Sequence, residues 1–244
     1  MHPVSLLFHD VFVRDPRESG FASAAADRYK LPVREFDAQL RSLGQARAVK
    51  LTFDDGGVSF YTIAALALEL RGLRAYCFVT TGRIGSRGFL TSAQLRELDA
   101  RDHILGVHSA THPARFSALS DASMRREWTV SRRALEDVLG HAVTVASVPG
   151  GYFSSRVAAA AAECGLRVLF TSEPVRATRV MHGCEVVGRF TIRRGSEPDL
   201  SSRLAQPAPW ARWREWAAWH AKGLVKPLLG SSYPRVADWI YGGV

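Results

Sequence analysis

Short apolar runs alternate with amphipathic segments along roughly the first 195 residues. The apolar runs predict buried strands at residues 4–8, 48–53, 75–80, 104–107, 143–148, 168–171 and 186–192. Helical spacing of apolar residues predicts helices at residues 32–43, 59–71, 91–101, 121–139 and 155–164. Strands that alternate with helices in this way favour a parallel sheet with crossover helices.

Start and stop signals support several of these boundaries. Pro32 opens one helix and Thr91 caps another, while Ser120 begins a long charged helix that Gly140 ends. Residues 11–30 are polar and contain turn signals, so we expect an irregular connection there.

A tryptophan-rich basic segment follows the alternating part of the chain. We divide the chain into a core domain over residues 1–200 and a helical extension over residues 201–244. The tryptophans lie three apart and therefore spread over about half of a helix surface, at Trp210, Trp213, Trp216 and Trp219. Basic residues lie among them or follow them, at Arg212, Arg214, Lys222, Lys226 and Arg235. This combination suits a helix on an anionic membrane, with packing on the barrel or across a substrate groove as the alternative.

Composition narrows the choice of compartment and partner. The chain has 244 residues, enough for one domain of the α/β barrel type, and a net charge of +9 that suits a polyanionic partner or an anionic membrane. It has no helix-turn-helix, zinc-finger or RNA-binding signature, so we expect no nucleic acid partner. The first apolar run is too short for a signal peptide, and three unpaired cysteines suit a reducing compartment, so we expect a cytoplasmic protein.

Acidic residues and histidines follow the ends of predicted strands. Asp54 and Asp55 close one strand, and such a buried pair is costly unless a metal ion or a proton transfer uses it. His108 and His112 follow another strand, and their spacing puts both imidazoles on one side of a helical turn. Because the carboxyl ends of parallel strands gather at one rim, these residues predict a divalent metal site with positions open to water and substrate.

Two motifs resemble those of a known family. Residues 52–56 (TFDDG) and residues 108–112 (HSATH) are similar to the first two motifs of the polysaccharide deacetylases, also called the NodB-homology or carbohydrate esterase family 4 group. The resemblance implies an α/β fold, a distorted (β/α) barrel, although periodicity alone leaves an open doubly wound sheet as an alternative. It also implies that Asp55, His108 and His112 bind the metal and that Asp54 is the general base. Zn²⁺ is the expected ion, with Co²⁺, Ni²⁺ or Mn²⁺ as alternatives.

The third motif of the family, R-x-P-x-G, lacks its arginine here. In residues 147–152, Gly150 and Gly151 are candidates for the backbone N–H of an oxyanion hole, and Tyr152 for substrate contact. Arg189, paired with Glu173, is our candidate for the arginine that normally orients the base.

The last motif of the family is an apolar strand ending in the histidine that acts as general acid. It is absent after residue 185, but residues 6–10 (LLFHD) match it at the other end of the chain. The first and last strands of a closed barrel are neighbours, and some exopolysaccharide deacetylases look permuted in this way. We therefore expect His9 to protonate the leaving amine, since a histidine near a carboxylate can be protonated at neutral pH.

These features predict a metal-dependent de-N-acylase that removes an acetyl or formyl group from an amino sugar in cell-envelope or exopolysaccharide synthesis. A nucleotide- or polyprenyl-linked sugar suits a cytoplasmic enzyme, which could lie peripherally on the inner face of the membrane through residues 207–244. One alternative is a catalytically decayed protein that binds a carbohydrate or a lipid-linked sugar, although the intact acidic pair and histidine pair oppose it. Deacetylation of peptidoglycan or chitin outside the cell is disfavoured because no signal peptide is evident.

Overall fold

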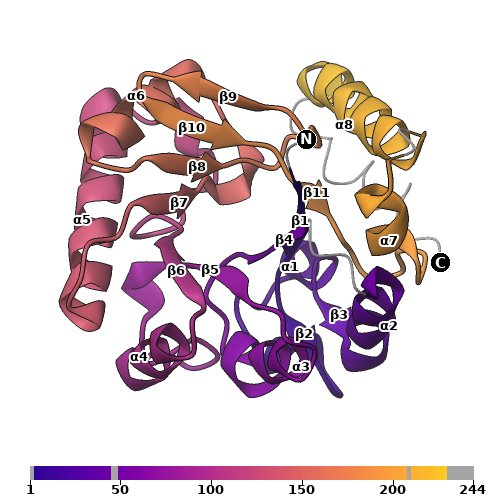
Figure 1. The fold of residues 1–244 in the computed structure, drawn as a ribbon. Helices are drawn as coiled ribbons and strands as arrows, with labels where there is room; N and C mark the ends of the chain where they lie inside the picture. Colours follow the sequence, from indigo (N-terminus) through magenta and orange to yellow (C-terminus); the bar gives the residue numbers. More distant parts are fainter. Residues whose placement is uncertain (1–2, 45–48, 208–209, 230–244) are drawn as a thin grey trace.

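A curled nine-stranded sheet forms the framework of the protein (Figure 1). The computed structural model describes residues 3–44, 49–207 and 210–229, with side chains as far as residue 221. The strand order is β11-β1-β4-β5-β6-β7-β8-β10-β9, and every pair is parallel except β9 with β10. The strands are β1 (Val4–Phe8), β4 (Val49–Phe53), β5 (Ala75–Val79), β6 (Ile104–Val107), β7 (Val145–Ser147), β8 (Val168–Phe170), β9 (Thr178–Met181), β10 (Cys184–Val187) and β11 (Phe190–Thr191).

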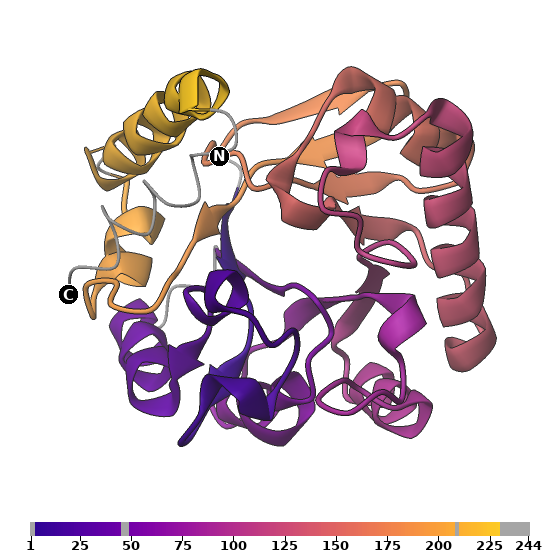
Figure 2. The same ribbon diagram turned by 180° about the vertical axis from the view of Figure 1, so that it is seen from behind.

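Helices ring the outside of this sheet in both views (Figure 2). They are α2 (Val33–Leu43), α3 (Ala65–Glu69), α4 (Ser92–Ala100), α5 (Asp121–Leu139), α6 (Ser155–Glu163), α7 (Leu200–Ala205) and α8 (Trp210–Leu229). The expected α/β fold of the distorted-barrel type is therefore confirmed. With helices on one face and barrel-filling side chains on the other, strands such as β1 are buried throughout and read as continuous apolar runs.

One bent segment, which carries β10 and β11, links the two ends of the sheet. The sequence predicted one strand over residues 186–192, but β10 and β11 are separate, with Gly188 and Arg189 between them. The chain bends at Gly188, where a Cβ would lie 2.5 Å from the Val175 side chain and from its carbonyl oxygen. β10 pairs with β8, whereas β11 pairs with β1. The expected neighbourhood of the first and last strands is thus confirmed.

Local signals fixed the helix boundaries well. Thr91 forms a capping box with Gln94 at the start of α4, and Ser120 caps α5. Gly140 ends α5 in the left-handed conformation with φ 79°. The predicted helix over residues 59–71 begins instead as a π-helical turn (Phe60–Ala64) that continues into α3.

The segment expected to be irregular is built from short elements. β2 (Val11–Phe12) pairs with β3 (Leu31–Pro32), and α1 (Ala24–Asp27) lies between them. Composition did not reveal these short elements, because side chains rather than regular helix or sheet hydrogen bonds pair many of the backbone amides here. The Glu18 carboxylate, for example, accepts hydrogen bonds from three successive amides, residues 13–15.

The C-terminal helices contact the barrel. Leu204 of α7 is buried in the core, so the first residues of the predicted extension pack with the preceding domain. On α8 the exposed tryptophans are Trp210 (66%), Trp213 (54%) and Trp216 (42%). Trp219 instead lines a small cavity with residues that follow β8 and β11. The side chains of Lys222 and Lys226, and all of Arg235, lie outside the described residues. In the part of the chain described here, no helix combines the length and apolarity needed to span a membrane.

Candidate active site

Four parallel strands direct polar side chains to one rim of the barrel. His9 follows β1, Asp54 follows β4, His108 follows β6, and Ser147 is the last residue of β7. The carboxyl ends of parallel strands meet at the same edge, so residues far apart in the chain become neighbours. This rim therefore collects the residues that the sequence analysis singled out.

Asp55, His108 and His112 form a compact group with metal-ligating atoms within 4.8 Å of one another. Nε2 of His108 lies 3.4 Å from Oδ1 of Asp55, and Nε2 of His112 lies 3.5 Å from the same oxygen. Ligands about 2.1 Å from a tetrahedral ion are roughly 3.4 Å apart, so this spacing fits Zn²⁺ or a similar cation.

The protonation state of the histidines also fits a metal. Nδ1 of His108 donates a hydrogen bond to the carbonyl oxygen of Ser147 at 3.0 Å, because a carbonyl can only accept. That tautomer leaves the Nε2 lone pair directed toward Asp55. Burial lowers the pKa of His108 to about 3 and lowers the pKa of His112 too, so both are neutral at pH 7.

A loop, rather than the expected helical turn, brings the two histidines together. Ser109 and His112 have positive φ values of 63° and 57°. The Glu127 carboxylate on α5 accepts hydrogen bonds from the amides of Ala110 and Thr111, both at 2.9 Å, and from the Thr111 hydroxyl. Our sequence analysis missed Glu127, because its place within a charged helix gives no sign that it faces the loop.

Arg189 clamps Asp54. Nη1 donates to Oδ1 of Asp54 at 2.7 Å, and Nη2 donates to Oδ2 at 2.8 Å. The guanidinium is fully buried, and its remaining donors reach Thr52 Oγ1, Ser147 Oγ and the carbonyl of Thr171. All five N–H groups thus have acceptors, as burial of an arginine requires. Sequence analysis identified Arg189 but missed Ser147, whose hydroxyl also contacts Asp54 at 3.0 Å.

The predicted pairing of Arg189 with the Glu173 carboxylate is wrong. That carboxylate binds Arg179 at 2.8 Å, while the Glu173 carbonyl oxygen accepts from the backbone N–H of Arg189. Asp54 is the carboxylate partner of Arg189, because the bend after β10 turns the arginine into the barrel.

The two adjacent aspartates have opposite electrostatic surroundings. Burial is the largest single influence and acts to raise the pKa of Asp54. The charge and hydrogen bonds of Arg189, with contributions from His108 and His9, together outweigh it and hold the pKa well below its usual range. Burial raises the pKa of Asp55, and the negative charges of Asp10 and Asp54 raise it further. Asp55 therefore sits where a cation is electrostatically favoured, which agrees with the metal-ligating geometry.

His9 lies on the same rim as these residues. The charges of Asp54, Arg189 and His112 all influence its pKa, and its ring is 5.0 Å from that of Tyr29. Its Nδ1 is buried and has no hydrogen-bond partner within the described residues. Burial is the largest influence and lowers its pKa to about 4, so His9 is neutral at pH 7, contrary to our expectation.

Gly150, Gly151 and Tyr152 lie in the loop that follows β7. Gly150 and Gly151 have φ values of 62° and 70°, and a Cβ at Gly151 would lie 3.1 Å from the Ser172 side chain. The guanidinium carbon of Arg115 is 5.7 Å from the centre of the Tyr152 ring. The loop begins directly after Ser147, which contacts Asp54, so it borders the candidate site.

Comparisons with known proteins agree with this geometry. The family model described as polysaccharide deacetylase matches residues 43–169, which is more than half of the chain. YxkH of Bacillus subtilis strain 168, whose name assigns it to the polysaccharide deacetylases, is 26% identical over 133 residues, or 54% of this chain. The match spans 47% of YxkH, about half of its length.

Solved structures show the same fold. The deacetylase PplD of Streptococcus pyogenes, determined with acetate, has a TM-score of 0.71 at 22% identity, covering 85% of this chain and 99% of PplD. IcaB of Ammonifex degensii has a TM-score of 0.63 at 20% identity, covering 88% of this chain and 96% of IcaB. At 22% and 20% sequence identity, the similarity to these two structures establishes the fold of this chain and nothing beyond it.

Proposed function

Because the chain belongs to the polysaccharide deacetylase family, we propose that it is a metal-dependent hydrolase that removes an N-acyl group, acetyl or formyl, from an amino sugar. One observation carries the proposal. A set of metal-ligating atoms, from Asp55, His108 and His112, adjoins a second carboxylate that a buried arginine holds ionised.

Asp55, His108 and His112 would hold the metal, with Zn²⁺ as the favoured ion. Bound there, it would polarise the acyl oxygen and lower the pKa of a water molecule. The protein contributes neutral imidazoles, a fixed tautomer at His108, and a histidine loop held by Glu127. These features orient the ligands before an ion arrives, which supports metal binding.

Asp54 is the proposed general base. Arg189 fixes its plane, and Oδ1 accepts from Arg189 Nη1, which leaves a lone pair for an attacking water. The same arginine makes Asp54 a weak base, since a carboxylate with a low pKa holds a proton poorly. Asp54 would therefore orient the water and take its proton after the pKa of that water has been lowered.

His9 is the proposed general acid, and proton balance sets the order of events. Water gives a proton to Asp54, its oxygen adds to the acyl carbon, and the C–N bond breaks as the amine gains a proton from His9. His9 starts neutral, so it takes up that proton from solvent after substrate binds, and Asp54 returns its own proton to solvent once the acyl product has left. Gly150 or Gly151 would donate a backbone N–H to the developing oxyanion, and Tyr152 would contact the sugar.

We assign the substrate to cell-envelope or exopolysaccharide synthesis, as a nucleotide- or polyprenyl-linked amino sugar in the cytoplasm. Residues 1–200 would be the catalytic domain and residues 201–244 an extension that contacts the inner face of an anionic membrane. The support is the exposure of Trp210, Trp213 and Trp216 on α8 together with a net charge of +9.

A catalytically decayed protein that binds a carbohydrate or a lipid-linked sugar is the second candidate, because the third motif lacks its arginine. Arg189 weakens that candidate, since it delivers a guanidinium to Asp54 from the segment between β10 and β11. This contact with Asp54 supports the hydrolase over the decayed binding protein.

The test is acyl release from N-acetylated and N-formylated amino sugars, free, nucleotide-linked and polyprenyl-linked, with the protein loaded with Zn²⁺ or Co²⁺. We expect acetate or formate from at least one, and release slower by a factor of about 10² to 10⁴ from the Asp54→Asn variant under the same loading. Full metal occupancy with sugar binding but no release from any of these substrates would favour the decayed binding protein.

A further inference from the structure

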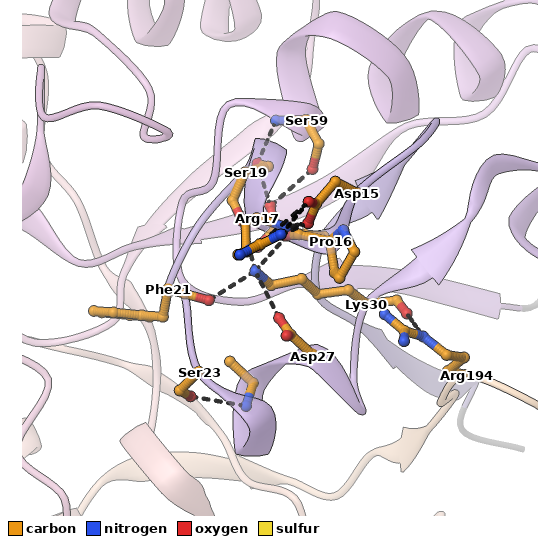
Figure 3. Close-up of polar contacts among 12 residues, drawn as sticks. Asp15, Pro16, Arg17, Ser19, Phe21, Ser23, Asp27, Lys30, Ser59 and Arg194 are labelled. Atoms are coloured by element: carbon orange, nitrogen blue, oxygen red, sulfur yellow. Dashed lines mark hydrogen bonds and ion pairs between the residues drawn. The ribbon is translucent and has the colours of Figure 1, made fainter. Parts of the chain in front are cut away.

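A buried lysine organises the loop between β2 and β3 (Figure 3). Nζ of Lys30 donates to the carbonyl oxygens of Pro16, Ser19 and Phe21, each at 2.7 Å. Lys30 is 1% exposed, and the Asp27 carboxylate lies 3.5 Å from its ammonium. All three N–H donors are used, so the ammonium holds the loop much as a bound cation coordinates carbonyl oxygens.

A second buried network ties the same loop to the candidate site. The hydroxyls of Ser19 and Ser59 both donate to Oδ1 of Asp10, at 2.6 and 2.7 Å, and the backbone N–H of Ser59 donates to Ser19 Oγ. A Cβ at Gly57, two residues after Asp55, would lie 1.9 Å from that same oxygen. The loop is therefore packed directly against the turn that carries Asp55.

At the end of this loop, Phe21 packs against a proposed metal ligand. Its ring centre is 4.9 Å from that of His112 and 5.1 Å from that of Phe89, with the guanidinium carbon of Arg83 at 5.6 Å. A hydrogen bond to Ser147 orients the His108 ring, and packing against Phe21 restrains the His112 ring. The lysine clamp sits on the carbonyl of Phe21 itself.

We propose that Phe21 is a positioning residue for the metal ligand His112, and that Lys30 fixes Phe21 by holding its loop. The inference rests on the proposed metal site at Asp55, His108 and His112. It assigns a role to a segment that composition marked as an irregular connection. The physical basis is that an imidazole such as that of His112, whose side chain is 25% exposed, binds a metal more tightly when its orientation is fixed in advance.

The first experiment compares Co²⁺ affinity in Phe21→Ala with that in Val13→Ala, an exposed position in the same segment. Phe21→Ala leaves the lysine and serine networks intact. We expect its Co²⁺ affinity to fall about tenfold, the low end of what loss of a supporting residue costs. The visible absorption of bound Co²⁺ should change as well, whereas Val13→Ala should match wild type. Unchanged affinity and absorption in Phe21→Ala would overturn the proposal.

The second experiment is a double-mutant cycle with Lys30→Met. If Lys30 acts through Phe21, Lys30→Met should weaken Co²⁺ binding in the wild-type background and add little in the Phe21→Ala background. Equal effects in both backgrounds would refute the link between the two residues. Lys30→Gln, which retains two N–H donors, serves the same cycle if the methionine variant does not fold.

The outcomes separate this inference from the metal assignment. Failure of the wild-type protein to bind Co²⁺ would refute the proposed metal site. Normal Co²⁺ binding by wild type, with unchanged affinity in Phe21→Ala, would refute only the positioning role of Phe21. The chemical shift of the His112 ring proton in metal-free protein gives an independent measure, because the nearby Phe21 ring shifts it without any ion.

Discussion

At the scale of single residues, Asp54 and Asp55 differ in partner rather than in burial. Both are buried, yet a permanent cation contacts Asp54, while two neutral imidazoles and other carboxylates surround Asp55. Adjacent residues of a strand end point in different directions, so one can meet Arg189 and the other the histidines. This separation allows the two side chains to take distinct roles.

The first prediction concerns this pair. Asp54→Asn should keep the metal and lose turnover by a factor of about 10² to 10⁴, the usual contribution of a general base. Asp55→Asn should weaken metal binding itself, because it removes the negative charge of the carboxylate that both imidazoles face. Metal content and acyl release, measured on both variants, check this. Loss of metal from Asp54→Asn with retention by Asp55→Asn would reverse the roles.

A second prediction concerns Arg189. In Arg189→Met, burial would dominate at Asp54 and raise its pKa. The carboxyl would then lose its proton, and become able to act as a base, only at higher pH. The acidic limb of the kcat profile should move to higher pH, and the free energy of unfolding should fall by about 3 kcal/mol or more, because a buried charge loses its partner.

Metal content of Arg189→Met should change little. Arg179→Met, which breaks a more exposed ion pair with Glu173, is the matched control and should leave the pH profile unchanged. An unshifted acidic limb in Arg189→Met would show that Asp54 is not the titrating base.

The third prediction concerns His9. The pKa of His9 in the folded protein, about 4, lies below the ordinary histidine value of 6.5, so the unfolded chain binds more protons between these two values. The stability contributed by neutral His9 is complete above pH 6.5 and is lost as pH falls toward 4. Thermal unfolding of metal-free wild type should therefore lose more stability than His9→Gln over that window.

His9→Gln should also bind metal normally and release the acyl product slowly. Parallel stability curves for the two proteins from pH 7 to pH 4 would contradict the depressed pKa. Full turnover in His9→Gln would leave the proton donor to be found elsewhere.

At the scale of elements, helix α5 holds the loop between His108 and His112, the histidine loop, through the carboxylate of Glu127. Glu127 accepts hydrogen bonds from the amides of Ala110 and Thr111. About two and a half turns further along the helix, Glu136 accepts one from the amide of Val143 in the same manner. The two glutamates make the same type of contact with different loops. The Glu127 loop carries the proposed ligands, whereas the Glu136 loop leads into β7.

The fourth prediction uses this internal match. Glu127→Ala and Glu136→Ala should each lower the free energy of unfolding by about 1 to 3 kcal/mol, because each leaves backbone donors without an acceptor. Glu127→Ala alone should also weaken Co²⁺ binding, by about tenfold. Equal Co²⁺ affinity in both variants would show that the histidine loop holds its shape without Glu127.

At the scale of the whole molecule, α8 presents tryptophans away from the barrel while Trp219 faces it. The rings of Trp210 and Trp213 stack with centres 5.2 Å apart. An exposed aromatic face on a basic protein is the feature that motivates the membrane proposal.

The fifth prediction is binding to vesicles that contain anionic lipid, weakened by salt because the attraction is partly electrostatic. The double variant Trp210→Ala with Trp213→Ala should bind more weakly at every salt concentration. Val180→Ala, at an exposed apolar position on β9, is the control. Equal sedimentation with neutral and anionic vesicles, or no binding by wild type, would contradict the proposal.

The sequence by itself determined the features that depend on neighbours in the chain. The Thr91 and Ser120 caps and the Gly140 stop are local, and the structure has them where the pattern placed them. The apolar runs gave strands such as β1, β4 and β6, although the run over residues 186–192 forms two strands. The candidate ligands were also recognisable, since Asp55, His108 and His112 each follow a strand end and parallel strands share a rim.

Tertiary structure alone decided contacts between distant segments. Arg189 meets Asp54 across 135 positions because the last strand bends at Gly188, whereas sequence reasoning gave Arg189 the wrong carboxylate partner. The depressed pKa of His9 comes from burial by the surrounding fold. The contacts of Lys30 could not be predicted from the sequence, because backbone carbonyl oxygens accept its hydrogen bonds and every residue type has one. Spacing along the chain reports which side chains reach a rim, while packing around the barrel decides which of them touch.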